Sequence, residues 1–454
     1  MSREQVSVDA EETGPLDTFR QFFALERDVL VLSLAMFAFS LGFQMTNRFL
    51  PEYMVALGAS GFVVGLFGTV GNVISAVFPY PGGAISDRIG SRYALTLFGL
   101  ISTLGFGIWL VAPNLGAITT AGVTIPPWIW IFVGLLLAQG WKSFGLGATF
   151  AVVKQATDPS RLAAGFAGTE TFRRTAFLIG PVLAAVLVGF HPDFTVSFQY
   201  VLAVAVAFGV IGTTAQHVLY DASEDSIGDS FEGIDQIRRD LRNMPQPLRP
   251  LLVGDTLVRF ANGMVYVFFV LVITQFYRVG FETTVALAGV SYAIDLSPEA
   301  FFGYLLGVEM LIALISMAPA AKIAERVGLK PVVALGFAVY ALFPVVLVGG
   351  PEILAPVMSL QWAMVFIFAF SGLRFAGLPS HKALIVGPAE QGAGGRVTGS
   401  YYLLRNTIVI PSAALGGYLW EFATPEVAFT AAAIVGVIGT AYFLIFGEEF
   451  EAYA

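Results

Sequence analysis

The sequence predicts an all-α membrane protein with twelve transmembrane helices in two pseudo-symmetric six-helix bundles. Its composition is the first observation. Of 454 residues, 56% are hydrophobic and only 12% are charged, whereas soluble domains carry about 25% charged residues. A water-soluble core cannot absorb that much apolar surface, so most of it must face lipid. Because lipid offers no hydrogen bonds to the backbone and the chain lacks β-barrel alternation, the spanning segments must be helices.

Successive apolar segments of membrane-spanning length are the second observation. We place the first six at about 29–52, 60–85, 92–112, 126–153, 162–190 and 197–219. Six more follow at about 250–277, 299–321, 331–349, 360–385, 397–420 and 426–447.

A polar break separates the two sets of segments. It opens acidic and ends basic, and Ile234, Ile237 and Leu241 lie at helical spacing within it. This spacing predicts an amphipathic helix on the membrane face. The predicted domains are a cytoplasmic tail (1–28), an N-terminal bundle (29–219), a cytoplasmic linker (220–249), a C-terminal bundle (250–447) and a second cytoplasmic tail (448–454).

The distribution of Lys and Arg tests this arrangement. Sixteen of the 24 basic residues lie in loops on one side of the predicted membrane, and the opposite loops carry Arg278 alone. Basic loops stay in the cytoplasm. The sequence therefore predicts a multi-pass protein of the cytoplasmic membrane with both termini inside the cell. Because the first 28 residues are polar and acidic, we expect no cleaved signal peptide.

A charged hairpin that occurs twice is the third observation. Gly83 to Leu95 reads G-A-I-S-D-R-I-G-S-R-Y-A-L, and the segment from Ala321 reads A-K-I-A-E-R-V-G-L-K. The two copies share acidic, basic and glycine positions at equal spacing: Asp87, Arg88, Gly90 and Arg92 in the first, and Glu325, Arg326, Gly328 and Lys330 in the second. Such a repeat indicates two copies of one module.

The repeat extends into the predicted helices. Gly61-x-x-x-Gly65 opens the segment at 60–85, and Gly303-x-x-x-Gly307 opens the one at 299–321, where glycines let helices approach closely. Three further pairs occupy corresponding positions in the two halves: Pro181 with Pro411, Lys142 with Arg374, and Arg173 with Arg405.

Twelve helices, two similar halves, a central cytoplasmic loop and this hairpin together resemble the major facilitator superfamily. The family's signature between its second and third helices is G-x-L-A-D-R-x-G-R-K-x-x-L, and it is matched here by Gly83, Asp87, Arg88, Gly90, Arg92 and Leu95. The resemblance implies a secondary transporter that works by alternating access. It also implies a cytoplasmic gate formed by the first hairpin and its second copy, which includes Glu325, Arg326 and Gly328.

Two patterns bear on the alternative of a multidrug or hydrophobic-compound exporter. Gly180-Pro181 is similar to an antiporter pattern in the family, but Ala184 and Ala185 replace its glycines. Gln139-Gly140 is present without the family's proton-coupling arginine, because Leu136 stands at that position. A non-transporting membrane sensor is a remoter alternative.

The chain lacks the residues that several other classes of function require. The chain has no cysteine, only three widely spaced histidines and no phosphate-binding loop, so we expect no enzyme activity, cofactor, metal site or nucleic-acid partner. The expected partners are a small-molecule substrate, the lipid bilayer and a coupling H⁺ or Na⁺, with the protein a monomer. A net charge of −8 with only five lysines is similar to proteins of halophilic archaea.

Charged residues at membrane depth are the candidates for function, since their burial is costly. The acidic ones are Glu52, Glu170, Asp255 and Glu309, and the basic ones are Arg48, Lys142, Arg173, Arg174, Arg259, Arg374 and Arg405. Local spacing predicts pairs between Glu170 and Arg174, Asp255 and Arg259, and Arg48 and Glu52. Four cations, Lys142, Arg173, Arg374 and Arg405, then remain against Glu309.

This excess of positive charge leads to the hypothesis of a small organic anion as substrate. Lys142 and Arg374 are the leading binding residues, supported by Arg48, Gln44, Asn47, Trp141, Asn262 and Tyr266. Glu309 is the candidate for ion coupling through H⁺ or Na⁺, or else the salt-bridge partner of one of the arginines. The remaining charges, Glu170, Arg173, Arg174, Asp255, Arg259 and Arg405, form a predicted network that either joins the halves or contributes to binding.

Overall fold

The computed structural model describes residues 27–78, 85–86, 88–120, 123–144, 162–220, 242, 244–287, 290–386 and 394–449. The predicted tails and most of the predicted amphipathic linker helix lie outside these ranges, so they stay predictions. In the N-terminal half the helices are α2 (Arg27–Thr46), α3 (Leu50–Ala56), α4 (Gly61–Val77), α6 (Ser91–Leu115), α7 (Ile129–Gln139), the π-helix η1 (Gly140–Phe144), α9 (Leu162–Val188) and α10 (Phe194–Leu219).

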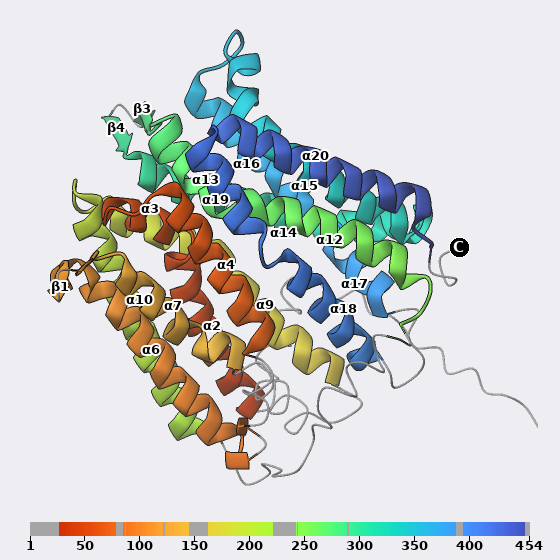
Figure 1. Cartoon of the computed structure of the whole chain (residues 1–454), viewed down its shortest axis with the longest axis horizontal. Helices are drawn as coiled ribbons and strands as arrows, with labels where there is room; N and C mark the ends of the chain where they lie inside the picture. Colours follow the sequence, from red (N-terminus) through yellow and green to blue (C-terminus); the bar gives the residue numbers. More distant parts are fainter. Residues whose placement is uncertain are drawn as a thin grey trace, which may run out of the picture.

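The C-terminal half repeats this plan. Its helices are α12 (Leu248–Val265), the 3₁₀-helix η3 (Tyr266–Phe268), α13 (Phe269–Leu271), the π-helix η4 (Val272–Phe276), α14 (Pro298–Val327), α15 (Leu329–Leu354), α16 (Leu360–Gly372), the 3₁₀-helix η5 (Leu373–Phe375), α17 (Leu378–Val386), α18 (Gly394–Val409), α19 (Ser412–Phe422) and α20 (Pro425–Phe446). Figure 1 shows the two halves as separate bundles that meet toward one end.

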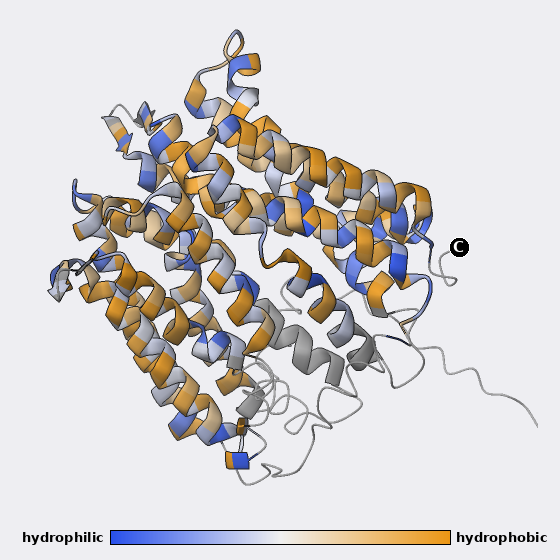
Figure 2. Cartoon of the chain, in the orientation of Figure 1, coloured by the Kyte–Doolittle hydropathy of each residue, from blue (hydrophilic) through white to orange (hydrophobic). Residues whose placement is uncertain are grey.

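Each of the twelve predicted spans contains helix in the described ranges. By length and hydropathy, seven of the described helices can cross a membrane, and α2 with α3, bent by 43°, makes eight. The other four positions hold the shorter α4 and α7, the arginine-bearing α9, and α18 with α19, which Pro411 separates. Figure 2 shows hydrophobic residues along α6 and α20, and side chains such as Leu100 and Ile445 are exposed there, as lipid-facing residues would be.

Two β-hairpins in the described ranges depart from a purely helical prediction. Strands β1 (Ile118–Thr120) and β2 (Val123–Ile125) pair antiparallel, as do β3 (Phe281–Leu287) and β4 (Val290–Leu296). The second hairpin pairs Phe281 with Leu296 and Leu287 with Val290. Its strands are rich in Thr, Val and Ile, which favour extended backbone. Both hairpins lie at the end of the molecule toward which the halves converge (Figure 1), and we call it the hairpin end.

The interface between the two halves, which we call the seam, is closed at the hairpin end. Small residues let the helices approach closely there. Helix α4 packs on α19, and α9 packs on α14. A Cβ added to Gly65 would lie 2.5 Å from the carbonyl oxygen of Ala413, and one on Gly303 would lie 2.7 Å from that of Pro181. The predicted close approach at these glycines is thus an approach between the two halves.

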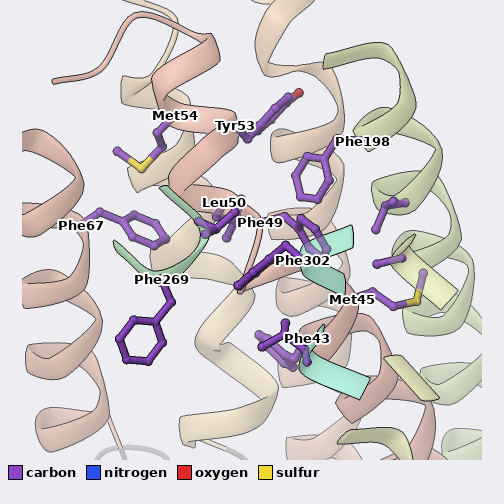
Figure 3. Close-up of a cluster of buried hydrophobic side chains, with 14 of the residues drawn as sticks. Phe43, Met45, Phe49, Leu50, Tyr53, Met54, Phe67, Phe198, Phe269 and Phe302 are labelled. Atoms are coloured by element: carbon purple, nitrogen blue, oxygen red, sulfur yellow. The ribbon is translucent and has the colours of Figure 1, made fainter. Parts of the chain in front are cut away.

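Aromatic side chains fill the same seam. Phe49, in the turn between α2 and α3, makes an edge contact with Phe302 of α14 at 5.6 Å between ring centroids. It also packs against Phe198 of α10, with the centroids 6.1 Å apart. Figure 3 shows this cluster, with Phe67 and Phe269 nearby. The hairpin end therefore has a packed hydrophobic core that joins residues from both halves.

We expect Gly65→Leu to destabilise this closed form. A leucine side chain would meet the backbone of α19, and overpacking of this kind costs about 1–3 kcal/mol. The purified variant should have a midpoint of thermal unfolding several degrees below that of the native chain. Gly71→Leu, on the same helix with nothing within 4 Å of an added Cβ, is the matched control. Equal midpoints for the two variants would contradict this account of the seam.

Candidate functional site

A cavity of about 390 Å³ lies between the two halves. Within the described chain its lining contains six basic residues and no acidic one: Arg48, Arg173, Arg174, Arg259, Arg374 and Lys382. Polar and aromatic side chains complete the wall, among them Gln44, Asn262, Tyr266, Tyr340 and Phe375. The predicted residues Arg48, Gln44, Asn262, Tyr266 and Arg374 thus come together at one cavity.

Glu309 lies behind this wall, fully buried on α14. Its Oε1 accepts a hydrogen bond of 2.6 Å from Nη2 of Arg374, and Nη2 of Arg48 lies 3.8 Å from the same oxygen. Its Oε2 accepts a hydrogen bond of 3.1 Å from the hydroxyl of Ser371. Of the two roles predicted for Glu309, the structure shows the salt bridge.

Arg374 is enclosed by aromatic rings as well as bound by Glu309. Its guanidinium carbon lies 4.8 Å from the ring centre of Phe375, 5.2 Å from that of Tyr340 and 5.4 Å from that of Phe343. Such cation–π contacts attract a desolvated arginine. Its Nε and Nη1 are buried without a hydrogen-bond partner. One carboxylate therefore leaves two of the nitrogen donors of this cation without an acceptor.

Arg48 has a similar setting on the N-terminal side. Its guanidinium carbon lies 4.0 Å above the ring of Tyr266, and its Nη1 is also buried without a hydrogen-bond partner. The predicted pair between Arg48 and Glu52 is wrong, because Arg48 turns toward Glu309 in the other half. The bend between α2 and α3 separates two residues that a continuous helix would have placed on one face.

Lys142 occupies a second, adjoining cavity of about 110 Å³. It lines this space together with Gln44, Trp141 and Arg173. Trp141 stacks on Phe39 with the ring centroids 4.5 Å apart. Gln44 and Arg173 line both cavities, so the two spaces adjoin. In the part of the chain that the structure describes, Lys142 has no ion pair.

The two symmetric cations share an unusual backbone setting. Lys142 lies in the π-helix η1, and Arg374 lies in the 3₁₀-helix η5. The π-helix η1 directly follows α7, and η5 lies between α16 and α17. Irregular turns of this kind occur often at functional sites. The irregular turn places Arg374 where it meets Glu309 instead of lipid.

A second charge cluster surrounds Asp255 on α12. Its Oδ1 lies 3.2 Å from Nε of Arg259, and its Oδ2 lies 3.0 Å from Nη1 of Arg405. The hydroxyl of Tyr401 donates to Oδ2 at 3.0 Å, and Nε2 of His381 lies 3.3 Å away. The predicted pair of Asp255 with Arg259 is confirmed. Arg405, which local spacing left without a partner on its own helix, shares the same carboxylate.

Tyr340 links the two charge clusters. Arg259 donates a hydrogen bond of 3.0 Å to its hydroxyl, and Arg374 lies over its ring. The sequence does not predict that His381 belongs to the cluster around Asp255, because no motif marks a single histidine. Its approach to Asp255 depends on the packing of α17 against α18 and α15.

The two charged hairpins are tied within their own halves in this conformation. Nε of Arg92 donates a hydrogen bond of 2.8 Å to the carbonyl of His217 at the end of α10. In the second copy, the backbone N–H of Lys330 donates to Glu449 at 2.8 Å. Gly90 and Gly328 both have positive φ, 81° and 90°, which the tight turn requires. Arg88, Glu325 and Arg326 are exposed.

Other predicted residues are less involved or lie outside the described part. Gly83 and Asp87 are outside it, as is the side chain of Glu170, so the predicted gate and the pair of Glu170 with Arg174 stay predictions. Asn47 is half-buried in the turn after α2 and does not line the cavities described above. Arg173 and Arg174 both line the larger cavity.

Two helical halves around a cationic cavity are the architecture of a membrane transporter. The chain belongs to the Major Facilitator Superfamily, whose family model matches residues 32–297. Two curated relatives, both described as uncharacterized MFS-type transporters of Mycobacterium tuberculosis, are 26% identical over 225 residues, or 49% of this chain and 49% of each relative. The chain thus spans about half the length of the curated relatives it matches.

Solved structures show the same fold at low sequence identity. A nucleoside transporter, NupG, has a TM-score of 0.70 at 13% identity and covers 92% of this chain and 100% of its own. A POT family transporter bound to a thioalcohol-conjugated peptide has a TM-score of 0.69 at 13% identity, covering 94% of this chain and 99% of its own. At these identities the likeness extends to the fold alone.

We expect Asp255→Asn to be strongly destabilising. The change removes the carboxylate that Arg259 and Arg405 share, and breaking a buried ion pair costs about 3–5 kcal/mol. The measurement is the midpoint of thermal unfolding of the purified chain. Glu282→Gln, an exposed position on β3, serves as the control. A midpoint for Asp255→Asn equal to that of the control would show that the cluster contributes nothing to stability.

Proposed function

We propose that this chain is a secondary active transporter that moves a small organic anion across the cytoplasmic membrane by alternating access. The observation that carries the proposal is the cavity lined by six basic residues and, in the described chain, no acidic one. Concentrated positive charge is costly at membrane depth. An anionic substrate would lower this cost.

The charge balance behind the wall supports this substrate class. Arg48 and Arg374 share one carboxylate, Glu309, and Arg259 and Arg405 share another, Asp255. Each group keeps one net positive charge when its carboxylate is ionised. Lys142 adds a further cation from the N-terminal half. A carboxylate or phosphate group suits the planar donors of the arginines.

The apolar part of the lining would contact the nonpolar portion of the substrate. Phe177, Tyr266, Phe375, Met310 and Met317 all face the larger cavity. Such a surface favours an organic anion with an apolar or aromatic portion over a bare inorganic ion. The volume of about 390 Å³ is in the range of ordinary small-molecule sites.

The arrangement of the halves supports alternating access. Among the described residues, packing across the seam is concentrated at the hairpin end, where Gly65 meets α19 and Gly303 meets α9. The hairpin end corresponds to the side that the basic loops avoid, so we assign it to the exterior. A rocking motion that separates these contacts would open the cavity outward, as in transporters whose site lies near the midplane. Coupling of this transport to H⁺ or Na⁺ is a further part of the proposal.

The multidrug exporter is the second candidate, and the aromatic lining favours it. The six basic residues disfavour a cationic drug in the same cavity through like-charge repulsion. The solved structures with this fold include a nucleoside transporter and POT family transporters, so the fold does not determine the transported substrate. A non-transporting sensor would bind the same ligand without exchanging it across a membrane.

The test is a thermal-shift screen of the purified chain with organic acids, sugars, amino acids and cationic dyes, followed by counterflow in proteoliposomes. Stabilisation by organic acids and exchange of the stabilising acid are the expected results. Stabilisation by cationic dyes alone would favour the exporter. Binding of an acid without counterflow would favour the sensor.

We expect Lys142→Ala and Arg374→Ala each to weaken binding of the stabilising acid by at least about tenfold, since charge-assisted hydrogen bonds contribute roughly 1.5–3 kcal/mol. The shift of the unfolding midpoint with acid concentration measures this affinity. Lys322→Ala, an exposed lysine on α14, should leave it unchanged. Unchanged affinity in both cavity variants would overturn the anion site.

A further inference from the structure

We propose that Glu52 is a proton-binding site, and that closing the hairpin end takes up one proton there. The inference rests on the proposed function, because it concerns the gate of the transport cycle. Glu52 lies on α3 in the N-terminal half and is only 4% exposed. Its partners, Thr274 and Gln275, belong to η4 in the other half. The carboxyl group therefore bridges the seam at its closed end.

Glu52 differs from the other described carboxylates at membrane depth in having no cation. Glu309 has two arginines within 4 Å, and Asp255 has two arginines and a histidine. In the part of the chain that the structure describes, Glu52 makes no ion pair. Its contacts are a neutral hydroxyl and a neutral amide. Burial of an ionised carboxylate with neutral partners alone is unfavourable.

Both hydrogen bonds of Thr274 are satisfied together when this group carries a proton. The hydroxyl oxygen of Thr274 lies within hydrogen-bonding distance of Oε2 of Glu52 and, at 3.0 Å, of the carbonyl of Val270. A threonine hydroxyl has one hydrogen to donate, so an ionised Glu52 leaves two acceptors competing for it. A protonated Glu52 donates to Thr274, which donates to Val270. Gln275 then donates to the remaining Glu52 oxygen at 2.6 Å.

The charged groups around Glu52 do not compensate it. Glu299, in the first turn of α14, adds a like charge. Arg48, in the turn before α3, approaches Glu309. Nε of Arg278 donates to the backbone carbonyl of Gln275.

The elements packed on α3 add no counter-charge. Helices α4 and α13 have no charged residue, and α10 carries Tyr200 and, at its far end, His217 as titratable groups. Tyr53 and Tyr277 hydrogen-bond the carbonyls of Trp109 and Val348.

The proton comes from the solution at the hairpin end. When the seam is open, Glu52 is hydrated and ionised. A proton from that solution adds to Oε2, and the acid form enters the seam as α3 meets η4. Opening the seam returns the proton to the same side. Acid outside therefore favours the form closed at the hairpin end, and one proton changes the closed-to-open ratio by at most about tenfold per pH unit.

The experiment uses the full chain in intact cells with a membrane-impermeant thiol reagent, because the chain has no cysteine. Val267→Cys is the reporter, since Val267 lies at the seam, where an added Cβ on Gly68 would contact it at 3.0 Å. Ile353→Cys, 79% exposed near the end of α15, gives the reference rate at each pH. Val267→Cys labelling, divided by this reference, should fall between about pH 8 and pH 5.5, by no more than about tenfold per unit.

Glu52→Gln in the reporter background should label slowly and without pH dependence, because a neutral amide mimics the acid. Glu421→Gln is the matched control: Glu421 reaches across the same seam to the N–H of Gly61 at 2.9 Å but is exposed. It should keep the pH dependence. If Glu52→Gln misfolds, Thr274→Val replaces it and should raise labelling at low pH by removing the acceptor of the acid proton.

Each of the following results would overturn the proposal: labelling that does not change with pH in the native background, unchanged pH dependence in Glu52→Gln, or a dependence on Na⁺ at constant pH. Absence of Ile353→Cys labelling would place the hairpin end inside the cell and overturn it as well. The readout needs no substrate, so failure of the anion-transport proposal in the counterflow assay would appear separately.

Discussion

The structure depends on charge compensation at membrane depth. Glu309 and Asp255 each hold two arginines, and Tyr340 connects the two groups through Arg259 and Arg374. Each carboxylate stabilises cations that lipid would not tolerate alone, yet leaves a positive remainder facing the cavity. In the proposed function, the same electrostatic cost that makes these pairs necessary makes the remaining positive charge a determinant of anion binding. Under that proposal, stability and substrate selection are two consequences of one constraint.

The contacts at the seam are of a different kind, because the proposed transport cycle requires the seam to open and close. Small residues such as Gly65 and Gly303 let backbones meet without interlocking side chains, and Phe49 packs against rings of both halves. Such contacts can separate and re-form without leaving a buried charge unpaired. Glu52 is a buried carboxyl group in the seam that has no cation beside it among the described residues, which is why we propose that closure involves a proton rather than an ion pair.

Much of the fold was predictable, and the reasons are local. Apolar length predicted the twelve helical positions, and the Gly-x-x-x-Gly segments predicted close approach. The recurrence of Lys142 and Arg374 at symmetric positions correctly marked two cations beside cavities. The two β-hairpins were not predicted because apolar length does not reveal short strands, although the run at 281–287, with Thr283, Thr284 and Val285, carries a β signal.

By itself, the sequence determined the membrane class, the twofold repeat and the excess of buried positive charge, because these follow from composition and periodicity along the chain. Only the tertiary structure decided which charges meet. Spacing paired Arg48 with Glu52, but the bend after α2 sends Arg48 to Glu309 and leaves Glu52 to Thr274 and Gln275, more than 220 residues away in the chain. Electrostatic partners are chosen by distance in space, and that distance is set by helix packing and bends that no local pattern encodes.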